Sequence, residues 1–299
     1  MSEVEAMRAT LRVLMNREGP PPSIADMRAA YEAWGLSNPL PEGAHVTPLD
    51  LGGVRADAIA SPGVRADVAL LYLHGGGYAI GSAAGHRHLA AHLAHAAEAT
   101  AYALEYRLAP EHPHPAAVDD AVAAYAALLQ RGIAPERIIV AGDSAGGGLT
   151  LALALAAKAR GLPQPAGLFC ISPWADLTQQ GASYVAAATR DLICSKDGLD
   201  AWAQMYAAGL DPSAPLISPV NGDFSGLAPI LIHVGADEVL LSDAVRIAER
   251  AGLANVPVQL VIEPDMPHVW HFMWTMLTQA RTSVAEAGAW MRGRISAAG

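Results

Sequence analysis

The 299-residue sequence carries little charge and only two cysteines. Charged residues make up 16% of the chain and hydrophobic residues 52%, which excludes a disordered protein because such chains need the opposite balance. Cys170 and Cys194 are too few for a disulfide framework and form no CxxC pair, so we expect reduced thiols in a cytoplasmic protein. The net charge of −10 repels phosphate backbones and argues against nucleic acid as a partner.

The sequence also lacks the patterns of a targeting or membrane-spanning segment. Glu3 and Glu5 stand where a signal peptide carries cations, and no apolar segment follows them. The longest charge-free apolar stretch in a helical pattern, 145–157, contains three glycines and is shorter than the roughly 20 residues that span a bilayer. We therefore expect no stable membrane insertion.

Short apolar runs that alternate with helical patterns occupy most of the chain. Six such runs begin near residues 68, 99, 137, 167, 230 and 256. Two earlier runs, 44–51 and 54–60, meet at Gly52-Gly53, which is a hairpin signal. This alternation predicts an α/β fold with a mainly parallel sheet of eight strands and helices on both faces.

Two segments depart from this alternation. Residues 3–18 and 23–35 are predicted to form amphipathic helices, divided by a Gly-Pro-Pro-Pro turn. Residues 175–227 are turn-rich and follow the C-terminal end of a strand, where an open α/β sheet holds its site. We expect residues 1–45 and this insertion to form a helical cap over a catalytic domain of residues 46–299.

A serine between glycines is the first candidate for chemistry. The segment Gly142-Asp143-Ser144-Ala145-Gly146 follows the apolar run 138–140 and opens a helical pattern. A nucleophile elbow has this strand–turn–helix context, and its tight turn requires small residues two before and two after the serine. The pattern alone is weak in a chain with 28 glycines, and a glycine-rich turn with a serine N-cap is the alternative. The context favours a nucleophile.

Three consecutive glycines, 75–77, follow His74 at the end of another apolar run. Such glycines let the backbone approach a ligand and turn its N–H groups inward, and acyl transfer needs two or three such donors for its oxyanion. We predict that the N–H groups of Gly76, Gly77 and Ala145 form this oxyanion hole and that His74 braces the loop. The alternatives are a flexible hairpin and a phosphate-binding loop, and the second would need a nearby lysine, which the sequence lacks there.

A serine nucleophile needs a base, and the base needs an orienting carboxylate. In proteins with a nucleophile elbow the acid and then the base follow the serine along the chain. Asp237 comes just past the apolar run 230–234, and His268 lies in the loop after the last run. Both therefore stand at the C-terminal ends of strands, and we predict Asp237 as the acid and His268 as the base.

Other residues compete for these two roles. Glu238, Asp243 and Asp265 are alternatives for the acid, and His233 and His271 for the base. His233 lies within an apolar run, which is typical of a core histidine, and His271 falls one helical turn after His268 and is expected to point elsewhere. Asp243 is typical of a solvated helix residue, and Asp265 is close enough to the base in sequence to shape its turn.

These motifs together resemble those of the bacterial hormone-sensitive-lipase-like esterases of the α/β-hydrolase fold. The resemblance covers roughly residues 65–275 and rests on HGGG at 74–77, GDSAGG at 142–147, the segments 106–111 and 171–174, Asp237 and His268. In two places the sequence departs from the family. Asp237-Glu238-Val239 stands where the family often has Asp-Pro-Leu, which leaves the acid open. Glu105-Tyr106-Arg107 stands where it often has Asp-Tyr-Arg, which keeps the charge.

The resemblance implies a serine carboxylesterase that acts on small-molecule esters of short to medium acyl chain length through an acyl-enzyme. Ser144 would be the nucleophile, His268 the base and Asp237 the orienting acid, with no metal or organic cofactor. Pairing through the last strand, near 256–262, would give a homodimer. The alternatives are a lactonase or amidase on the same scaffold, or a small-molecule receptor built on an inactive hydrolase.

Five aromatic residues are candidates for lining a substrate pocket, with core and cap packing as the alternative: Tyr78, Trp174, Tyr184, Trp202 and Tyr206. Four histidines share the helical stretch near 84–98: His86, His88, His92 and His95. The i, i+4 spacing of His88 and His92 would suit a metal pair. No HExxH motif and no clear third ligand accompany them, so we expect no metal site.

Overall fold

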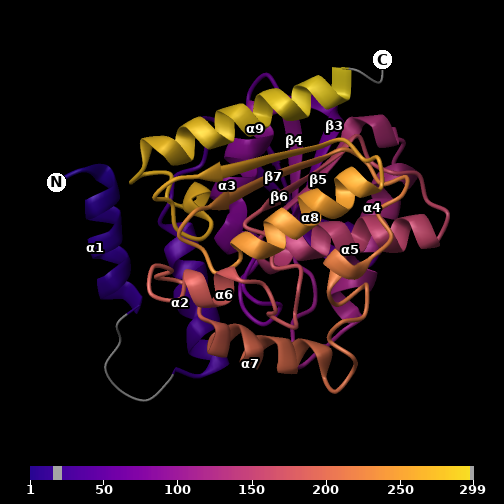
Figure 1. Ribbon diagram of the computed structural model, residues 1–299. Helices are drawn as coiled ribbons and strands as arrows, with labels where there is room; N and C mark the ends of the chain where they lie inside the picture. Colours follow the sequence, from indigo (N-terminus) through magenta and orange to yellow (C-terminus); the bar gives the residue numbers. More distant parts are fainter. Residues whose placement is uncertain (16–21, 297–299) are drawn as a thin grey trace.

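The computed structural model describes residues 1–15 and 22–296, which build one eight-stranded sheet with helices on both faces (Figure 1). The strands are β1 (His45–Leu51), β2 (Val54–Ala60), β3 (Arg65–Leu73), β4 (Ala99–Leu104), β5 (Ile138–Asp143), β6 (Gly167–Ile171), β7 (Ile230–Gly235) and β8 (Val258–Glu263). The helices are α1 (Glu3–Met15), α2 (Ile24–Leu36), α3 (Ala83–Ala96), α4 (Ala116–Gln130), α5 (Ala145–Ala159), α6 (Ser183–Ala186), α7 (Lys196–Ala207), α8 (Leu241–Leu253) and α9 (Thr278–Ser296). The predicted end of the first helix, 16–18, lies outside the described residues.

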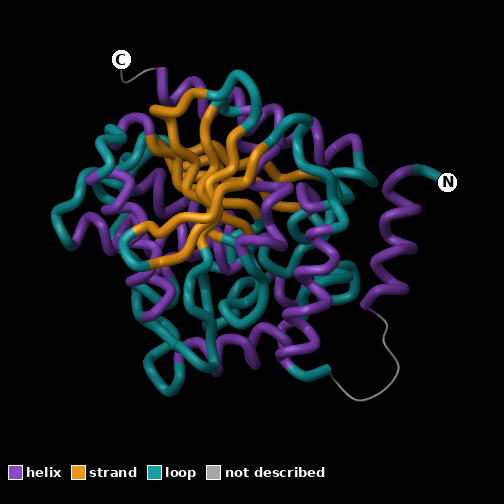
Figure 2. The backbone as a smooth tube through the Cα atoms, turned by 180° about the vertical axis from the view of Figure 1, so that it is seen from behind, coloured by secondary structure: helices purple, strands orange, loops and turns teal. Residues whose placement is uncertain are grey.

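The strand order is β1-β2-β4-β3-β5-β6-β7-β8. The pairs β1–β2 and β2–β4 are antiparallel, and every later pair is parallel. The predicted hairpin and mainly parallel sheet are confirmed, and Figure 2 shows the strands as a twisted sheet between helices. Because the neighbours β3, β5, β6, β7 and β8 run in parallel, the loops that follow them open at one edge of the sheet.

Both faces of the sheet are buried, which explains why its strands are nearly continuous apolar runs. Leu71 and Leu73 of β3 belong to a core with α4, α5 and α8, whereas Leu70 and Tyr72 point the other way into a core with α3 and α9. In Figure 1, α9 passes above the strands while α8 and α5 lie below them. These layers fix the strand ends from which the site is built.

In Figure 1, α1 and α2 lie on the left of the molecule and α7 runs along the bottom. α1 buries Met7 and Leu11 in a third apolar cluster with Met266 and Trp270. α2 begins at the N-cap Ser23, whose hydroxyl accepts a hydrogen bond from the N–H of Asp26. Of the helices in residues 1–15 and 22–296, none combines the length and apolarity needed to cross a bilayer.

Candidate active site

Ser144 occupies the turn between β5 and α5, at the strand–turn–helix junction that the sequence predicts. Its φ of 54° and ψ of −120° are a conformation that non-glycine residues rarely adopt. The turn closes because Gly142 and Gly146 lack side chains: a Cβ on Gly146 would overlap the carbonyl oxygen of Leu73. The Ser144 N–H donates to the Ile171 carbonyl at 2.8 Å. The serine is thus held at the tip of a tight elbow.

The glycine loop that follows β3 lies beside this elbow. Gly76 and Gly77 have φ values of 113° and 60°, which turn the chain in a way that side chains would strain. The Gly75 N–H donates to Asp143 Oδ1 at 3.0 Å. In the described part of the chain, the hydrogen bonds of the loop leave the N–H groups of Gly76 and Gly77 unused. Ala145 is the first residue of α5, where a helical N–H has no acceptor.

His74 braces the loop, as the sequence predicts. Its ring stacks on Tyr106 with centroids 4.1 Å apart, and its carbonyl accepts the Tyr106 hydroxyl at 2.7 Å. Its Nδ1 lies 2.8 Å from the Gly75 carbonyl. Burial lowers the pKa of His74 to about 3, so the ring is neutral and takes no part in acid–base chemistry at neutral pH.

The carboxylate that meets His268 is Glu238, and the prediction of Asp237 at this position is corrected. Glu238 Oε2 lies 2.8 Å from His268 Nδ1. Its Oε1 accepts from the Ser172 hydroxyl at 2.6 Å and from the Gly235 N–H at 2.5 Å. Glu238 is fully buried, and its side chain turns inward from the loop after β7 toward these donors.

Asp237 points to the other side of the same loop. Its Oδ2 lies 2.7 Å from Arg8 Nη2, and its Oδ1 lies 3.5 Å from Arg190 Nε. A carboxylate shared between two arginines is not available to orient an imidazole. The physical reason for the correction is that neighbouring residues in this turn face opposite ways, and the longer glutamate is the one that faces the histidine.

The surroundings of His268 change its basicity. Burial by itself lowers the pKa of the imidazole, but the side chains of Cys194 and Glu238 beside it raise that pKa well above its usual value. Burial raises the pKa of the neighbouring Cys194 thiol as well. Of the two neighbours, Glu238 is the one whose oxygen lies within hydrogen-bond distance of His268 Nδ1.

A short chain of contacts links the serine to this pair. The Ser144 N–H donates a hydrogen bond to the Ile171 carbonyl. Ser172, which follows Ile171, donates its hydroxyl to Glu238 and accepts the Val269 N–H at 3.1 Å. Among the described residues, no hydrogen bond joins the Ser144 hydroxyl to the His268 ring. Such bonds are often long in free enzymes and tighten when substrate binds.

The other candidates for acid and base have structural partners. His233 Nδ1 lies 3.0 Å from His271 Nε2 within the core, and burial lowers the pKa of both rings, as expected for core histidines. The prediction that Asp243 is solvated is wrong: it is fully buried and accepts two backbone N–H groups of the segment after β6 at 2.9 Å each. Burial raises its pKa to about 7. Asp265 lies in the turn before His268 with a φ of 62°.

The predicted pocket aromatics form a cluster near the elbow. The rings of Tyr78 and Tyr206 stack with centroids 3.8 Å apart, and Trp174 lies 6.0 Å from Tyr78. Trp202 of α7 packs on Gly77, where an added Cβ would lie 3.0 Å from its Cγ. Tyr184 instead directs its hydroxyl to Asp243, at 3.2 Å.

The histidine-rich helix α3 packs into the core. His88 Nε2 lies 3.2 Å from the Phe272 carbonyl, and His92 Nε2 lies 3.1 Å from the Pro39 carbonyl. In the described ranges, no three His, Cys, Asp or Glu side chains cluster as metal ligands. The ring nitrogens of this predicted i, i+4 pair therefore serve to tie α3 to its neighbours.

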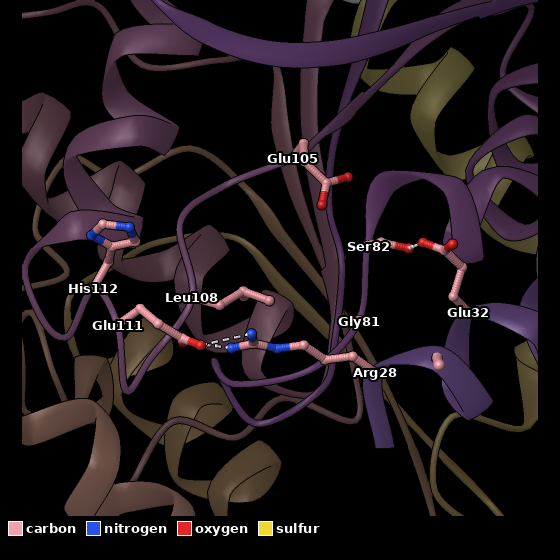
Figure 3. Close-up of a pocket in the computed structure, with 9 residues that line it drawn as sticks. Arg28, Glu32, Gly81, Ser82, Glu105, Leu108, Glu111 and His112 are labelled. Carbon is pink, nitrogen blue, oxygen red and sulfur yellow. Dashed lines mark hydrogen bonds and ion pairs between the residues drawn. The ribbon is translucent and has the colours of Figure 1, made fainter. Parts of the chain in front are cut away.

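A cavity of about 450 Å³ lies between α2 and the segments after β3 and β4 (Figure 3). Figure 3 shows the Arg28 guanidinium facing the Glu111 carboxylate, with Nη2 and Oε2 2.7 Å apart. Arg28 Nε also donates to the Ala79 carbonyl at 2.8 Å. Neither Ser144 nor His268 lines this cavity. Its arginine fastens α2 to the glycine loop.

The sequence pattern gave no role to two residues around Glu238 and His268. Ser172 was visible only as part of the segment 171–174, and nothing in its neighbours shows that its hydroxyl meets Glu238. Asp191 accepts the Val239 N–H at 2.9 Å and so fixes the residue after the buried glutamate. Both contacts join segments far apart in the chain, and a local pattern cannot carry them.

The sequence of this chain is similar to a family model and to known proteins. The family model for the α/β hydrolase fold matches residues 70–272. An acetyl-hydrolase of Streptomyces hygroscopicus is 48% identical over 223 residues, which cover 75% of each chain. A putative acetyl-hydrolase of Mycobacterium tuberculosis is 39% identical over 255 residues, 85% of this chain and 82% of its own.

Solved structures are similar over the whole length. An esterase from the bacterial hormone-sensitive lipase family superposes with a TM-score of 0.95 at 41% identity, over 99% of this chain and 100% of its own. A hormone-sensitive lipase from a metagenome library superposes with a TM-score of 0.95 at 45% identity, over 99% of each chain.

Proposed function

From the premise that this chain belongs to the bacterial hormone-sensitive-lipase-like esterases of the α/β-hydrolase fold, we propose that it hydrolyses short to medium acyl esters with Ser144, His268 and Glu238. That the chain is a carboxylic-ester hydrolase follows from its relatives. The observation that carries the residue assignment is the 2.8 Å contact between His268 Nδ1 and the buried Glu238, at the sheet edge that also holds the elbow and the glycine loop.

In this mechanism Ser144 Oγ attacks the ester carbonyl while His268 Nε2 takes the hydroxyl proton. Glu238 holds the Nδ1–H tautomer and stabilises the imidazolium that forms. The N–H groups of Gly76, Gly77 and Ala145 hold the oxyanion, and each such donor lowers the barrier by about 3 to 4 kcal/mol in comparable sites. His268 then protonates the leaving alcohol, and water attacks the acyl-enzyme to release the acid.

The test is hydrolysis of p-nitrophenyl acetate and butyrate by the wild type and Ser144→Ala. The proposal expects kcat to fall by at least about 10³-fold, because the oxyanion hole alone supports little turnover. Ser213→Ala, which removes an exposed hydroxyl, is the matched control and is expected to keep wild-type rates. Equal rates for the wild type and Ser144→Ala would reject the proposal.

We propose further that residues 1–45 and the insertion 175–227 act as the cap that shapes the acyl site. The packing of Trp202 on Gly77 supports this, because it brings a cap side chain against the oxyanion loop. Tyr78, Trp174 and Tyr206 are proposed to lie along the acyl chain, whereas the bond of Tyr184 to Asp243 favours a packing role for Tyr184. An acyl-chain-length series, with lactones and anilides alongside, ranks the ester, lactone and amide alternatives.

We also propose where the enzyme is located and which partners it has. Both cysteines are free, which supports a reducing, cytoplasmic location. The net charge of −10 supports the absence of a nucleic-acid partner. β8 ends the sheet and leaves Ile262 44% exposed, which supports pairing of two copies through this edge. Light scattering after size-exclusion chromatography measures the oligomeric state.

A further inference from the structure

We propose that Arg8 of α1 is a positioning residue, which holds the loops of Glu238 and His268 in the relative position that catalysis needs. The inference rests on the proposed function of those two residues and assigns a role to the N-terminal helix. Arg8 touches neither the nucleophile nor the imidazole, so it acts only through the two loops that it joins.

One guanidinium nitrogen of Arg8 meets both loops. Its Nη2 lies 2.7 Å from Asp237 Oδ2, and Asp237 directly precedes the buried Glu238. The same Nη2 lies 3.1 Å from Asp265 Oδ1 and 3.3 Å from the Asp265 carbonyl, three residues before His268. Arg8 thus bridges the loop after β7 to the loop after β8, at the level of the acid and the base.

Besides this bridge, the two loops are joined at that point by the Glu238–His268 contact and by the Ala236 N–H, which donates to the Glu263 carbonyl at 2.9 Å. The Asp237 N–H reaches the Met266 carbonyl at a long 3.4 Å. Asp265 has a φ of 62°, which a non-glycine residue rarely adopts. Asp237 and Asp265 also carry like charges that both lie within reach of one nitrogen, so without the cation they would repel. The arginine therefore offsets both the strain and the repulsion.

α1 itself stays attached by contacts that do not involve Arg8. The Glu3 carboxylate accepts the N–H of Thr278 at 2.7 Å and its hydroxyl at 2.9 Å, at the start of α9. Met7 and Leu11 are buried against Met266 and Trp270. Removing the guanidinium alone therefore leaves the helix in place and isolates the bridge.

The test compares Arg8→Met, Arg8→Lys and the control Arg12→Met, which removes an exposed cation from the same helix. For p-nitrophenyl butyrate we expect kcat of Arg8→Met to fall about tenfold with KM within twofold, because displacing catalytic groups by a fraction of an ångström slows chemistry rather than binding. Arg190 remains near Asp237, which limits the loss. Arg8→Lys is expected to retain most of the wild-type kcat, and Arg12→Met is expected to retain all of it.

Two further measurements separate positioning from packing. The downfield proton resonance of the His268 Nδ1–H, which reports its bond to Glu238, is expected to shift or broaden in Arg8→Met and to stay unchanged in Arg12→Met. In a double-mutant cycle with Asp237→Asn, the double variant is expected to be no slower than the slower single variant, because both changes break the same bridge. Asp237→Asn leaves α1 intact and supplies the test if Arg8→Met does not fold.

The proposal is overturned if kcat of Arg8→Met or of Asp237→Asn stays within twofold of wild type, or if only KM changes. It is also overturned if kcat falls as far in Arg12→Met as in Arg8→Met. An inactive wild type would instead overturn the proposed function. An active wild type with an unaffected Arg8→Met overturns only the bridge.

Discussion

Two adjacent carboxylates show how the surroundings of a residue decide its role. Glu238 is fully buried and receives donors from Ser172, Gly235 and His268. Asp237 lies nearer the surface between two arginines. The buried carboxylate, which meets the imidazole directly, is suited to stabilise a charge that appears there during the reaction.

The first prediction separates these two carboxylates. Glu238→Gln is expected to lower kcat by about 10³- to 10⁴-fold, because an amide leaves the imidazole in the wrong tautomer and no longer stabilises its positive charge. Asp237→Asn is the matched control, and its kcat is expected to fall only about tenfold. Steady-state kcat for p-nitrophenyl butyrate is the measurement, and a larger loss in Asp237→Asn would reject Glu238 as the acid.

The second prediction concerns the pH dependence of the rate. Only the neutral imidazole of His268 can accept the serine proton, and the raised pKa keeps the ring protonated to a higher pH than an ordinary histidine. The acid limb of kcat/KM is therefore expected above the unperturbed value of about 6.5. A profile that stays flat from mildly acidic to mildly alkaline pH would contradict His268 as the base.

At the scale of the element, the elbow depends on glycines that let β5, α5 and β3 approach one another. A Cβ on Gly146 meets the backbone of Leu73, which cannot move because β3 is paired on both sides. By contrast, a Cβ on Gly252 of α8 meets nothing within 4 Å. The same substitution therefore has opposite consequences in two helices.

The third prediction follows from this contrast. Gly146→Ala is expected to destabilise the protein by about 3 kcal/mol or more, because overlap with fixed backbone forces the elbow apart. Gly252→Ala is expected to stabilise it by up to about 1 kcal/mol, since alanine has the higher helix propensity. Urea unfolding of both variants gives the two free energies, and equal midpoints would contradict the close-packed elbow.

The sequence predicted most of the structural elements correctly, for reasons that are local, but it chose the wrong one of two neighbouring carboxylates as the partner of His268. The eight apolar runs and the elbow around Ser144 are patterns of neighbouring residues, and their structures follow from neighbours. The choice between Asp237 and Glu238 depends on which way each side chain turns, and that is decided by Ser172 and Arg8 from distant parts of the chain. The burial of Asp243 against the segment after β6 was hidden for the same reason.

At the scale of the whole molecule, several histidines are buried as neutral rings. Burial lowers the pKa of His74 and His88 to about 3 and that of His233 to about 4. The unfolded chain titrates these groups near 6.5, so below that pH it binds protons that the folded state does not. Asp243, whose pKa burial raises to about 7, and His268, whose pKa is also raised, have the opposite effect. They are outnumbered by the buried neutral histidines, which also include His92 and His271.

The fourth prediction is that the folded state weakens as the pH falls. The stability that these histidines contribute is fully present above about 6.5 and is lost as the pH falls toward their folded pKa values, by about 1.4 kcal/mol per pH unit for each histidine. The free energy of unfolding in urea is therefore expected to be lower at pH 5.5 than at pH 7.5. Equal or greater stability at pH 5.5 would show that the rings are not buried as neutral groups.

The most direct test of the central claim is peptide mapping of the enzyme after reaction with a fluorophosphonate, which forms a stable adduct with an activated serine. The account predicts one adduct, on the peptide that contains Ser144, formed far more slowly in Glu238→Gln than in Asp237→Asn. An adduct on another residue, no adduct at all, or the reverse order of the two variants would contradict it.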